Sequence, residues 1–391
     1  MNDDGPCGPL AGITVVDLTS TFMGPYCTLL LAQFGARVIK VEPPAGDITR
    51  TIGDVTDNAL GPIFVNCNRG KESIRLDLTA EADRQVLFGL IRTADVLAHN
   101  RPPGSIERLG LDYETLARIN PRLIHCGMYG YGAHGPYDRR PAYDDVIQAV
   151  SGVAANQAGS GEPQYVRTPM TDKITALMAA YAIASALFER TVSGRGQAIE
   201  VPMFETTVQF LLLEQQSGYI FDPPQGRPSY ARTASPNRRP YRTADGLVSV
   251  MPYTDEHWRI LFSLFDDSML ADRRFATMKA RTDNIDELYG WLSDQIARWD
   301  TAALLARLDG LRVPSAEVAS VDSLFSDPHL EAVAFFEREE HPKLGSLRLP
   351  RNPVGFSRSS RARLSPAPLL DQDGPRLRQE AASPPRRAAS G

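Results

Sequence analysis

The feature that most constrains the fold is an alternation of short apolar runs with helix-forming segments in the N-terminal half. Residues 13–18 (ITVVDL) and 37–41 (RVIKV) are rich in β-branched side chains and predict buried strands. Residues 26–34 (YCTLLLAQF) lie between them and predict a buried helix that ends at Gly35. The alternation continues with a helix at 80–93, a strand at 96–99, a helix at 113–119 and a strand at 122–128. This order predicts an α/β domain of Rossmann-like, doubly wound type, with a mostly parallel sheet and ligands at the carboxyl ends of its strands.

The second half of the chain predicts a long helix, a loop and a smaller domain. Residues 172–189 (DKITALMAAYAIASALFE) have the composition of a helix buried on most of its surface, and residues 198–202 predict a further strand. Pro, Gly, Ser and Arg accumulate without periodicity between residues 218 and 242, which indicates a linker or an active-site loop. A strand at 247–251 and helices near 255–265, 284–299 and 302–308 then predict a small α+β unit.

These patterns give a division of the chain into segments. We expect a large α/β domain at residues 1–200, a linker helix at 201–224, the small domain at 225–325, a return to the large domain at 326–364 and a flexible, proline-rich tail at 365–391.

Composition excludes several classes of protein. The 42 Lys and Arg against 47 Asp and Glu give a formal charge of −5, which disfavours a nucleic-acid partner. No apolar run of about 18 residues predicts a membrane span, and the N-terminus has no apolar signal region, so we expect a cytoplasmic protein. The four cysteines form no C-x-x-C pair and the six histidines show no ligand spacing, so we expect free thiols and no metal.

One motif matches a dinucleotide fingerprint only in part. Residues 130–135 (GYGAHG) follow a predicted strand, but the next segment, PYDRRP, cannot open the helix that would carry a pyrophosphate. We interpret the motif as a surface loop, and a glycine loop beside a ligand stays open as an alternative.

Asp172 permits two interpretations at the start of the long helix. An aspartate there commonly caps a helix, because its carboxylate accepts hydrogen bonds from free backbone N–H groups. The same amides would keep the carboxylate ionised among apolar neighbours, which makes it a competent nucleophile toward a thioester. The local pattern alone favours the cap. Four basic residues in predicted loops are each interpreted as surface charges that together could hold phosphates: Arg69, Lys71, Arg101 and Arg108.

The order and spacing of several longer stretches are specific. They resemble the family III coenzyme A (CoA) transferases, the group that includes formyl-CoA transferase and carnitine CoA-transferase, from residue 9 to about residue 357. The matching stretches are PLAGITVVDLT, GPYCTLLLAQFGARVIKVEPPAGDITR, NCNRGKESIRLDL, ADVLAHNRPPGSIERLGLDYETLARINPRLIHCGMYGYGAHGP, AYDDVIQAVSG and TDKITALMAAYAIASALFERTVSGRGQAIEVPMFE.

The resemblance implies that Asp172 is the nucleophile, which attacks an acyl-CoA to form a mixed anhydride and then an aspartyl-CoA thioester. CoA and a small carboxylic acid are then substrates, and no cofactor is needed. The implied partner is a second copy, in an interlocked homodimer of two ring-like chains with each active site between a large and a small domain. Arg69 and Lys71 return to the surface interpretation. The implied CoA contacts are Phe22, Met23, Leu76, Asp77, Leu78, Thr79, Asn100, Arg101, Pro102, Arg108, Pro141, Ala142, Tyr143 and Asp144.

Some positions depart from the family pattern. Pro43 and Pro141 stand where formyl-CoA transferase has an arginine and a lysine, so the nucleotide contacts are expected to differ. The glycine-rich substrate loop of that enzyme has no counterpart at residues 218–247, which argues against formate and oxalate. The arginine-rich loop instead suggests an acid with a second carboxylate, such as succinyl-CoA, recognised by Tyr230, Arg232, Arg238 and Arg239.

Two other functions stay as alternatives. The related α-methylacyl-CoA racemase has the same aspartate, but pairs it with a histidine just before an upstream aspartate. Tyr143 occupies that histidine position here, although Asp144 or Asp145 could serve as the second base. A catalytically silent relative that only binds CoA or a partner would also keep Asp172 as a cap.

Overall fold

The computed structural model describes residues 7–102, 104–159 and 161–383. The chain forms two compact units. The first contains Met1–Ser151, Val166–Phe210 and Ala334–Gly391, and the second contains Gly152–Tyr165 and Leu211–Val333. The second unit is therefore larger than the small domain expected at residues 225–325, and it includes a segment near residue 160 that the sequence assigned to the large domain.

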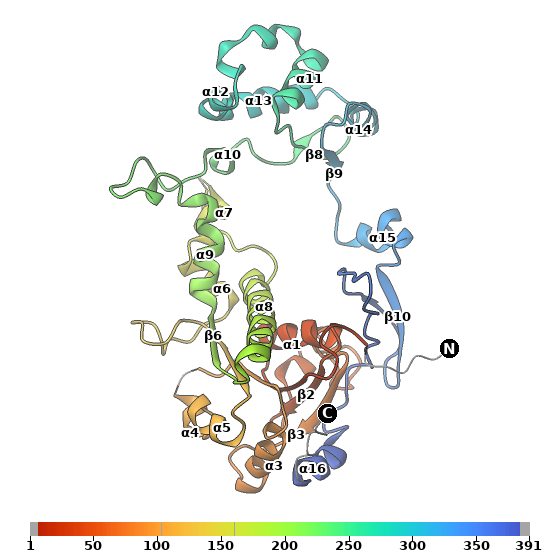
Figure 1. Ribbon diagram of the computed structural model, residues 1–391. Coiled ribbons are helices and arrows are strands. Elements are labelled where there is room, and N and C mark those ends of the chain that lie inside the picture. Colours follow the sequence, from red (N-terminus) through yellow and green to blue (C-terminus); the bar gives the residue numbers. More distant parts are fainter. Residues whose placement is uncertain (1–6, 103, 160, 384–391) are drawn as a thin grey trace. The chain divides into compact units, whose positions relative to one another are not determined.

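The first unit is built on a six-stranded parallel sheet, as the sequence predicts (Figure 1). The strand order is β3-β2-β1-β4-β5-β6, and the order reverses between β1 and β4. Adjacent loops therefore leave the carboxyl ends of these two central strands in opposite directions, which is where ligands bind in such sheets. The strands are β1 (Thr14–Leu18), β2 (Arg37–Glu42), β3 (Lys71–Arg75), β4 (Val96–His99), β5 (Ile124–Tyr129) and β6 (Ala198–Pro202).

Helices cover both faces of the sheet, and each face has its own core. Val15 and Val16 are neighbours in β1 and point to opposite faces of the sheet. Both are fully buried because each face is covered. Helices α1 (Met23–Gln33) and α8 (Met170–Ser193) cover one face. The other face is covered by α3 (Glu81–Ile91), α4 (Ser105–Arg108), α5 (Tyr113–Ile119) and α16 (Gly374–Ala382). The remaining elements of this unit are α2 (Pro62–Asn68), α6 (Asp144–Val150) and the antiparallel pair β10 (Phe336–His341) and β11 (Gly345–Pro350).

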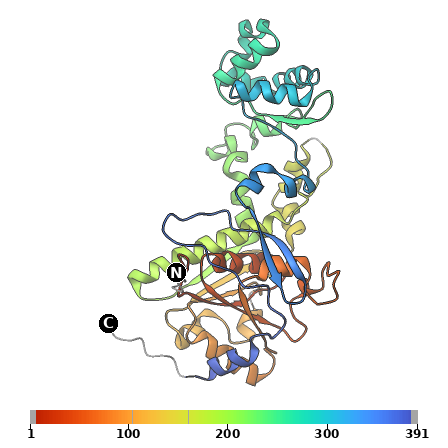
Figure 2. The same ribbon diagram turned by 90° about the vertical axis from the view of Figure 1, so that its right-hand side faces the viewer.

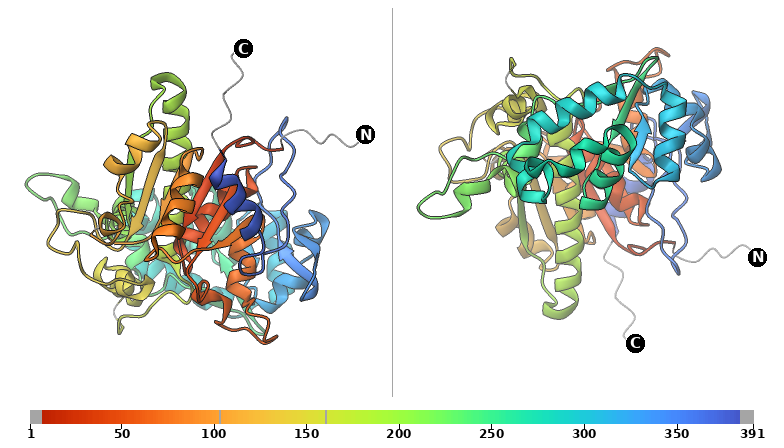
Figure 3. Two further views of the ribbon diagram at one scale, coloured as in Figure 1. Left: turned by 90° about the horizontal axis from the view of Figure 1, so that it is seen from below. Right: turned by 90° about the horizontal axis from the view of Figure 1, so that it is seen from above.

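The prediction of a flexible tail from residue 365 is wrong for α16. This helix packs against α3 with Leu377 fully buried (Figures 2 and 3). The two helices approach so closely at Gly89 that a Cβ there would lie 2.4 Å from the carbonyl oxygen of Ala381. Arg37 also bridges Glu72 and Glu380, at 2.8 and 2.6 Å. Proline-rich composition misled the prediction, because the buried contacts come from distant segments. Residues 384–391 of the predicted tail lie outside the described residues.

The second unit has a separate core. A three-stranded antiparallel sheet, in the order β7-β8-β9, packs with helices whose apolar side chains include Trp258, Leu288 and Leu304. Helix α9 runs from the first unit into the second. These elements are α7 (Val153–Ala158), α9 (Met203–Gln215), α10 (Ala231–Ala234), β7 (Tyr241–Arg242), β8 (Leu247–Val250), α11 (Asp255–Phe265), α12 (Met278–Asp283), α13 (Ile285–Ile296), α14 (Thr301–Gly310), β9 (Ser315–Glu317) and α15 (Pro328–Ala332). Within the described part of the chain, no helix is both long and apolar enough to cross a membrane.

The surface interpretation of Lys71 and Arg69 is wrong. Lys71 is 2% exposed in β3, and its Nζ donates to Asp17 Oδ2 at 3.1 Å and to Thr28 Oγ1 at 2.7 Å. Burial alone would raise the pKa of Asp17, but Lys71 and Lys40 hold it below its usual value. Arg69 is 3% exposed and donates to the carbonyl of Pro350. Each charge is tolerated in the interior because folding supplies hydrogen-bonded partners.

The buried pair predicts an asymmetric response to mutation. Asp17→Asn leaves Lys71 charged and unpaired, so we expect a loss of about 3–5 kcal/mol in the free energy of unfolding. The double variant Asp17→Asn, Lys71→Met removes both charges, so it should lose less than the sum of the two single variants. Urea denaturation followed by circular dichroism measures the cycle, and simple additivity would contradict the coupling.

Candidate active site

A cavity of about 370 Å³ opens at the carboxyl ends of β1, β4 and β5, beside the start of α8. This is the edge at which the strand order predicts ligand binding. Asp172 forms part of its wall. The other lining residues are Ser20, Thr21, Phe22, Met23, Asn100, Pro102, Tyr129, Gly130, Arg139, Arg140, Pro141, Ala142, Tyr143 and Met203.

Buried charges fix the loop that follows β1 in this wall. Lys40, fully buried, donates from Nζ to the carbonyl of Thr19 at 3.1 Å and to Asp47 at 2.9 Å. Asp47 in turn accepts a hydrogen bond from the backbone N–H of Thr21, whose φ of 72° is strained for a β-branched residue. Asn100, at the end of β4, exchanges two hydrogen bonds with the backbone of Ser20, at 2.8 and 3.1 Å. The loop is therefore anchored from three directions.

Asp172 is not the cap of its helix. The helix begins at Met170, so Asp172 lies in the first turn. The capping role belongs to Asp144 of α6, whose Oδ1 accepts the hydroxyl of Thr171 at 2.7 Å and the backbone N–H of Asp172 at 3.0 Å. Gln148 donates to the other oxygen of Asp144 at 2.6 Å. Among the described residues, none donates a hydrogen bond to the Asp172 carboxylate. The cap interpretation of Asp172 is therefore wrong.

The electrostatics of Asp172 also differ from the sequence prediction. Burial, followed by the charges of Asp144 and Asp145, raises the pKa of Asp172 to about 7. The expectation that helix amides keep this carboxylate fully ionised is wrong, because Asp144 uses the amide of Asp172 itself. Lys173 lowers the pKa, but its effect is smaller. Near neutral pH the side chain exists in both protonation states, and its anion is poorly solvated.

The cavity brings together about half of the positions that the resemblance assigned to CoA. Phe22, Met23, Asn100, Pro102, Pro141, Ala142 and Tyr143 line it with Asp172. Asp144 lies behind Asp172 and holds it. The positions that do not line the cavity are Leu76, Asp77, Leu78 and Thr79 after β3, Arg101 after β4 and Arg108 in α4.

Reasoning from the sequence missed seven lining residues: Ser20, Thr21, Tyr129, Gly130, Arg139, Arg140 and Met203. Arg139 and Arg140 belong to PYDRRP, the segment that breaks the dinucleotide fingerprint, and the sequence patterns assigned them no role in a site. Their position after a predicted parallel strand was a signal, because such loops reach the ligand edge of the sheet.

The glycine motif is a loop held by carboxylates. Gly132 donates its N–H to Glu205 at 3.0 Å, and Ala133 donates its N–H to Glu200 at 2.5 Å. A dinucleotide fingerprint would direct such N–H groups at a pyrophosphate. Carboxylates already occupy these two, so the loop interpretation agrees with the structure. Gly130 packs closely against Ala142, another residue of the cavity wall. A Cβ atom at Gly130 would lie 2.4 Å from the Cβ atom of Ala142.

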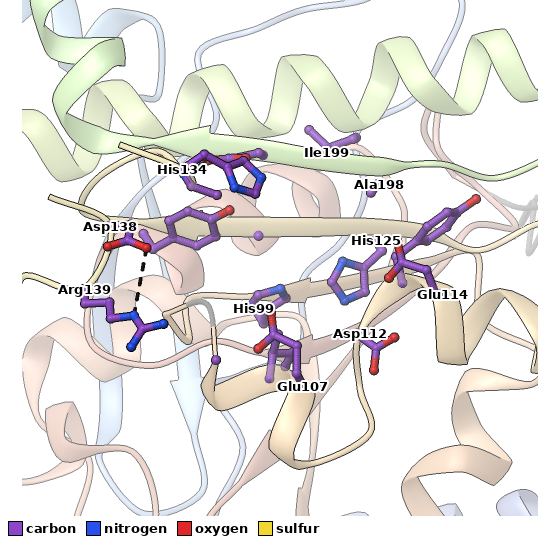
Figure 4. Close-up of a pocket in the computed structure, with 17 residues that line it drawn as sticks. His99, Glu107, Asp112, Glu114, His125, His134, Asp138, Arg139, Ala198 and Ile199 are labelled. Carbon is purple, nitrogen blue, oxygen red and sulfur yellow. Dashed lines mark hydrogen bonds and ion pairs between the residues drawn. The ribbon is translucent and has the colours of Figure 1, made fainter. Parts of the chain in front are cut away.

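A second cavity, of about 670 Å³, shares Tyr129 and Arg139 with the first (Figure 4). His99 and His125 lie side by side in it, with ring centroids 4.9 Å apart. Burial and the neighbouring His125 lower the pKa of His99 to about 3, so its ring is neutral. The wall also carries the acidic residues Glu107, Asp112, Glu114, Asp138 and Glu200. This cavity is unsuited to an anionic substrate, and the described residues contain no cluster of His, Cys, Asp or Glu that could hold a metal ion.

Comparison with known proteins decides the family. The model of CoA-transferase family III matches residues 10–374. The chain belongs to this family. It is 36% identical over 388 residues to the acetyl-CoA:oxalate CoA-transferase of Acetobacter aceti, with 97% of each chain covered. It is 32% identical to the succinyl-CoA:mesaconate CoA-transferase of Haloarcula hispanica, with 96% of each chain covered. The succinate–glutarate CoA-transferase of Agrobacterium fabrum is also 32% identical, over 90% of this chain and 92% of that one.

Solved structures of two similar proteins have the same fold. A CaiB/BaiF family protein from Brucella suis superposes with a TM-score of 0.80 at 32% identity, and covers 96% of this chain and 100% of its own. Rv3272 from Mycobacterium tuberculosis superposes with a TM-score of 0.82 at 28% identity, over 95% of this chain and 99% of that one. The resemblance drawn from the sequence motifs is thus confirmed.

The raised pKa of Asp172 predicts a pH-dependent effect on the stability of this family III protein. Below the usual value of 3.8 the carboxyl group is protonated in both the folded and unfolded states. Between that pH and about 7 the unfolded chain loses the proton while the folded chain keeps it, so folding becomes less favourable. Asp172→Asn should change stability little near pH 4 and raise it by roughly 1–3 kcal/mol at pH 7.5.

Urea denaturation at several pH values measures this difference. Asp145→Asn is the matched control, because it removes one of the charges that raise the pKa of Asp172 and keeps that carboxyl group. It should give a smaller gain than Asp172→Asn. A stabilisation by Asp172→Asn that is the same at pH 4 and pH 7.5 would contradict the raised pKa.

Proposed function

We propose that the protein transfers CoA from an acyl-CoA to a carboxylic acid by covalent catalysis at Asp172. One observation carries the proposal: in a family III CoA-transferase fold, Asp172 lines a cavity and its carboxylate accepts no hydrogen bond from any described residue. A carboxylate with only a structural role at the helix start would accept hydrogen bonds with both oxygens, as Asp144 does. CoA is a substrate in this proposal, and no cofactor takes part.

The proposed reaction balances without a net proton. The Asp172 carboxylate attacks the thioester carbonyl of the donor, and the C–S bond breaks. Asp172 and the acyl group then form a mixed anhydride, and CoA is released as a thiolate. The thiolate then attacks the aspartyl carbonyl, which releases the donor acid and leaves an aspartyl-CoA thioester. The acceptor carboxylate attacks this thioester, and the returning thiolate attacks the acyl carbonyl, which restores Asp172. Each anhydride needs protection from water, which a partly buried carboxylate at the base of a cavity favours.

The racemase alternative has less support. Racemisation needs a base on each face of the α-carbon. Tyr143, at the histidine position, is 73% exposed and lines the cavity, but its phenol is not a base of the strength of histidine. Asp144 is buried, and both of its oxygens already accept hydrogen bonds. Of the two neighbouring carboxylates, only Asp145 is exposed.

One member of the arginine-rich loop, Arg232, is not available for acid recognition. Arg232 is 8% exposed, donates to the hydroxyl of Tyr289 at 3.1 Å and lies over the ring of Tyr253. It therefore has a structural role within the second unit. The lack of a glycine-rich loop also does not exclude oxalate, since a relative with 36% identity is an acetyl-CoA:oxalate CoA-transferase.

We also propose a homodimer. Helix α8 covers the sheet with one face and exposes large apolar side chains on another: Leu177, Tyr181, Phe188 and Val192 are 53, 70, 75 and 83% exposed. The spacing of four or seven residues between them makes one stripe along the helix. A monomer rarely exposes such a stripe, and a second copy is the occupant that the family resemblance implies. The interlocked arrangement rests on that resemblance alone. The four free cysteines agree with a reducing compartment, and we place the protein in the cytoplasm.

The nucleophile can be identified directly. Purified protein mixed with a panel of acyl-CoAs and then with hydroxylamine should carry a CoA-dependent modification on the peptide that holds Asp172. Mass spectrometry should find it in the wild type and not in Asp172→Ala. Its rate of formation should rise between pH 6 and pH 8, because the carboxylate ionises with a pKa of about 7. Absence of any adduct, together with exchange of the α-proton into deuterated water, would favour the racemase.

The dimer proposal has a separate test. Phe188→Glu places a charge in the centre of the exposed stripe of α8, so the variant should sediment as a monomer or aggregate where the wild type sediments as a dimer. Arg195→Glu, in the exposed turn after α8, is the control and should stay dimeric. A wild type that is monomeric at micromolar concentration would contradict the proposal.

A further inference from the structure

The segment between β5 and α6, residues 130–143, forms part of the mouth of the cavity that contains Asp172. It supplies more of the wall than any other described segment does, through Gly130, Arg139, Arg140, Pro141, Ala142 and Tyr143. Most of these residues are exposed: the side chain of Arg139 is 91% exposed, and Tyr143 is 73% exposed. Residues that line a cavity and also reach the solvent lie at its mouth, so this segment separates the interior of the cavity from bulk water on that side.

The two ends of the segment meet. A Cβ atom at Gly130 would lie 2.4 Å from the Cβ atom of Ala142, so the chain returns to close contact with its own start. The carbonyl of Gly130 accepts the N–H of Phe204 at 3.0 Å, and Gly132 donates its N–H to Glu205 at the start of α9. A compact surface loop whose ends meet is an Ω-loop, a class that is frequently functional.

Tyr137 joins the middle of this Ω-loop to the core of the first unit. Its ring packs edge to face on those of Tyr131 and Phe204, with centroids 5.5 and 6.3 Å apart. Tyr131 is 5% exposed and belongs to the core that α1 and α8 cover. The guanidinium of Arg140 also lies over the ring of Tyr137, 4.2 Å from its centre. Tyr137 does not itself line the cavity, so it acts on the cavity only through the loop that it holds.

Every intermediate of the proposed reaction is open to attack by water. Both mixed anhydrides and the aspartyl-CoA thioester form at Asp172, inside the cavity. When water attacks the thioester, the C–S bond breaks and the oxygen of water joins the carboxyl group of Asp172. One proton of that water goes to the CoA sulfur, and the other goes to the solvent as the carboxyl group ionises. Exclusion of water at the mouth therefore decides between transfer and hydrolysis.

We propose that Tyr137 is a positioning residue, which holds the Ω-loop at the mouth of the cavity so that intermediates at Asp172 react with an acid and not with water. This inference rests on the proposed function. Loss of the ring would release the middle of the loop from Tyr131 and Phe204, and would also remove the surface on which Arg140 lies. Water would then reach the intermediates more easily.

The test measures how the intermediates divide between hydrolysis and transfer. Acetyl-CoA and succinyl-CoA are each incubated with the protein, first alone and then with oxalate, mesaconate or glutarate, and chromatography measures free CoA and the new acyl-CoA. Tyr137→Ala should raise the ratio of hydrolysis to transfer on the order of 10-fold, because a small displacement of an active-site wall has a large effect on the reaction. Tyr137→Phe keeps the ring, so its ratio should stay within about twofold of wild type.

A pair of glycine variants tests the Ω-loop without a change at Tyr137. Gly130→Ala puts a methyl group into the contact with Ala142 and forces the two ends of the loop apart, so it should raise the same ratio. Gly135→Ala is the matched control in the same loop, because the nearest atom to a Cβ there is the carbonyl oxygen of Gly132, at an ordinary 3.6 Å. This control should keep the wild-type ratio. Circular dichroism shows that each variant is folded.

The outcomes separate this inference from the proposed function. An unchanged ratio of hydrolysis to transfer in Tyr137→Ala would overturn the inference and leave the proposed function intact. A ratio in Tyr137→Phe as high as that in Tyr137→Ala would also overturn it, because the ring contacts would then have no part in the effect. A wild type that forms no adduct at Asp172 with either donor would overturn the proposed function, and the inference with it.

Discussion

The site depends first on the hydrogen bonds that Asp144 makes to the start of α8. One carboxylate oxygen of Asp144 accepts both the hydroxyl of Thr171 and the N–H of Asp172. A helix start needs such acceptors, and here a neighbouring helix supplies them in place of the helix's own side chain. The carboxylate of Asp172 is thereby released from capping, and the same contact puts a second negative charge beside it. After burial, which is the larger effect, the same contact with Asp144 thus contributes both to the position of Asp172 and to its raised pKa.

The opposite wall depends on ions buried beneath the loop that follows β1. Lys40 binds the carbonyl of Thr19, and Asp47 accepts the N–H of Thr21. Buried ion pairs add little to stability compared with apolar packing, but they hold backbone groups in one geometry. Here that geometry includes a positive φ at Thr21, which would be costly in a free loop. The ions therefore serve the precision of the cavity, and Phe22 and Met23 reach its wall as a result.

The sequence predicts those parts of the structure that local patterns determine. Apolar β-branched runs gave the strands of the parallel sheet, because a strand buried on both faces has no room for polar alternation. Lys71 was misjudged because its partner, Asp17, is 54 residues away, and no local pattern reveals the pairing. The helix α16 was missed because Leu377 is buried only by contact with distant elements such as α3. Asp172 itself was found through the family motifs, whereas its relation to Asp144 required coordinates. The division into domains that the sequence suggests stays a prediction.

Charge balance links these features to the binding of anions in the cavity. The proposed reaction brings the carboxylate of an incoming acid to a cavity that already contains Asp172, with Asp144 and Asp145 behind it. Like charges at short range disfavour this encounter in a medium less polar than water. The neighbouring cavity does little to relieve it, because His99 there is neutral and acidic residues outnumber arginines in its wall. Lys173, the residue after Asp172, lowers the pKa of Asp172, but less than burial and the two carboxylates raise it. Arg139 and Arg140 line the same cavity as Asp172 and carry the opposite charge, so they reduce the repulsion for any anion that enters, CoA included.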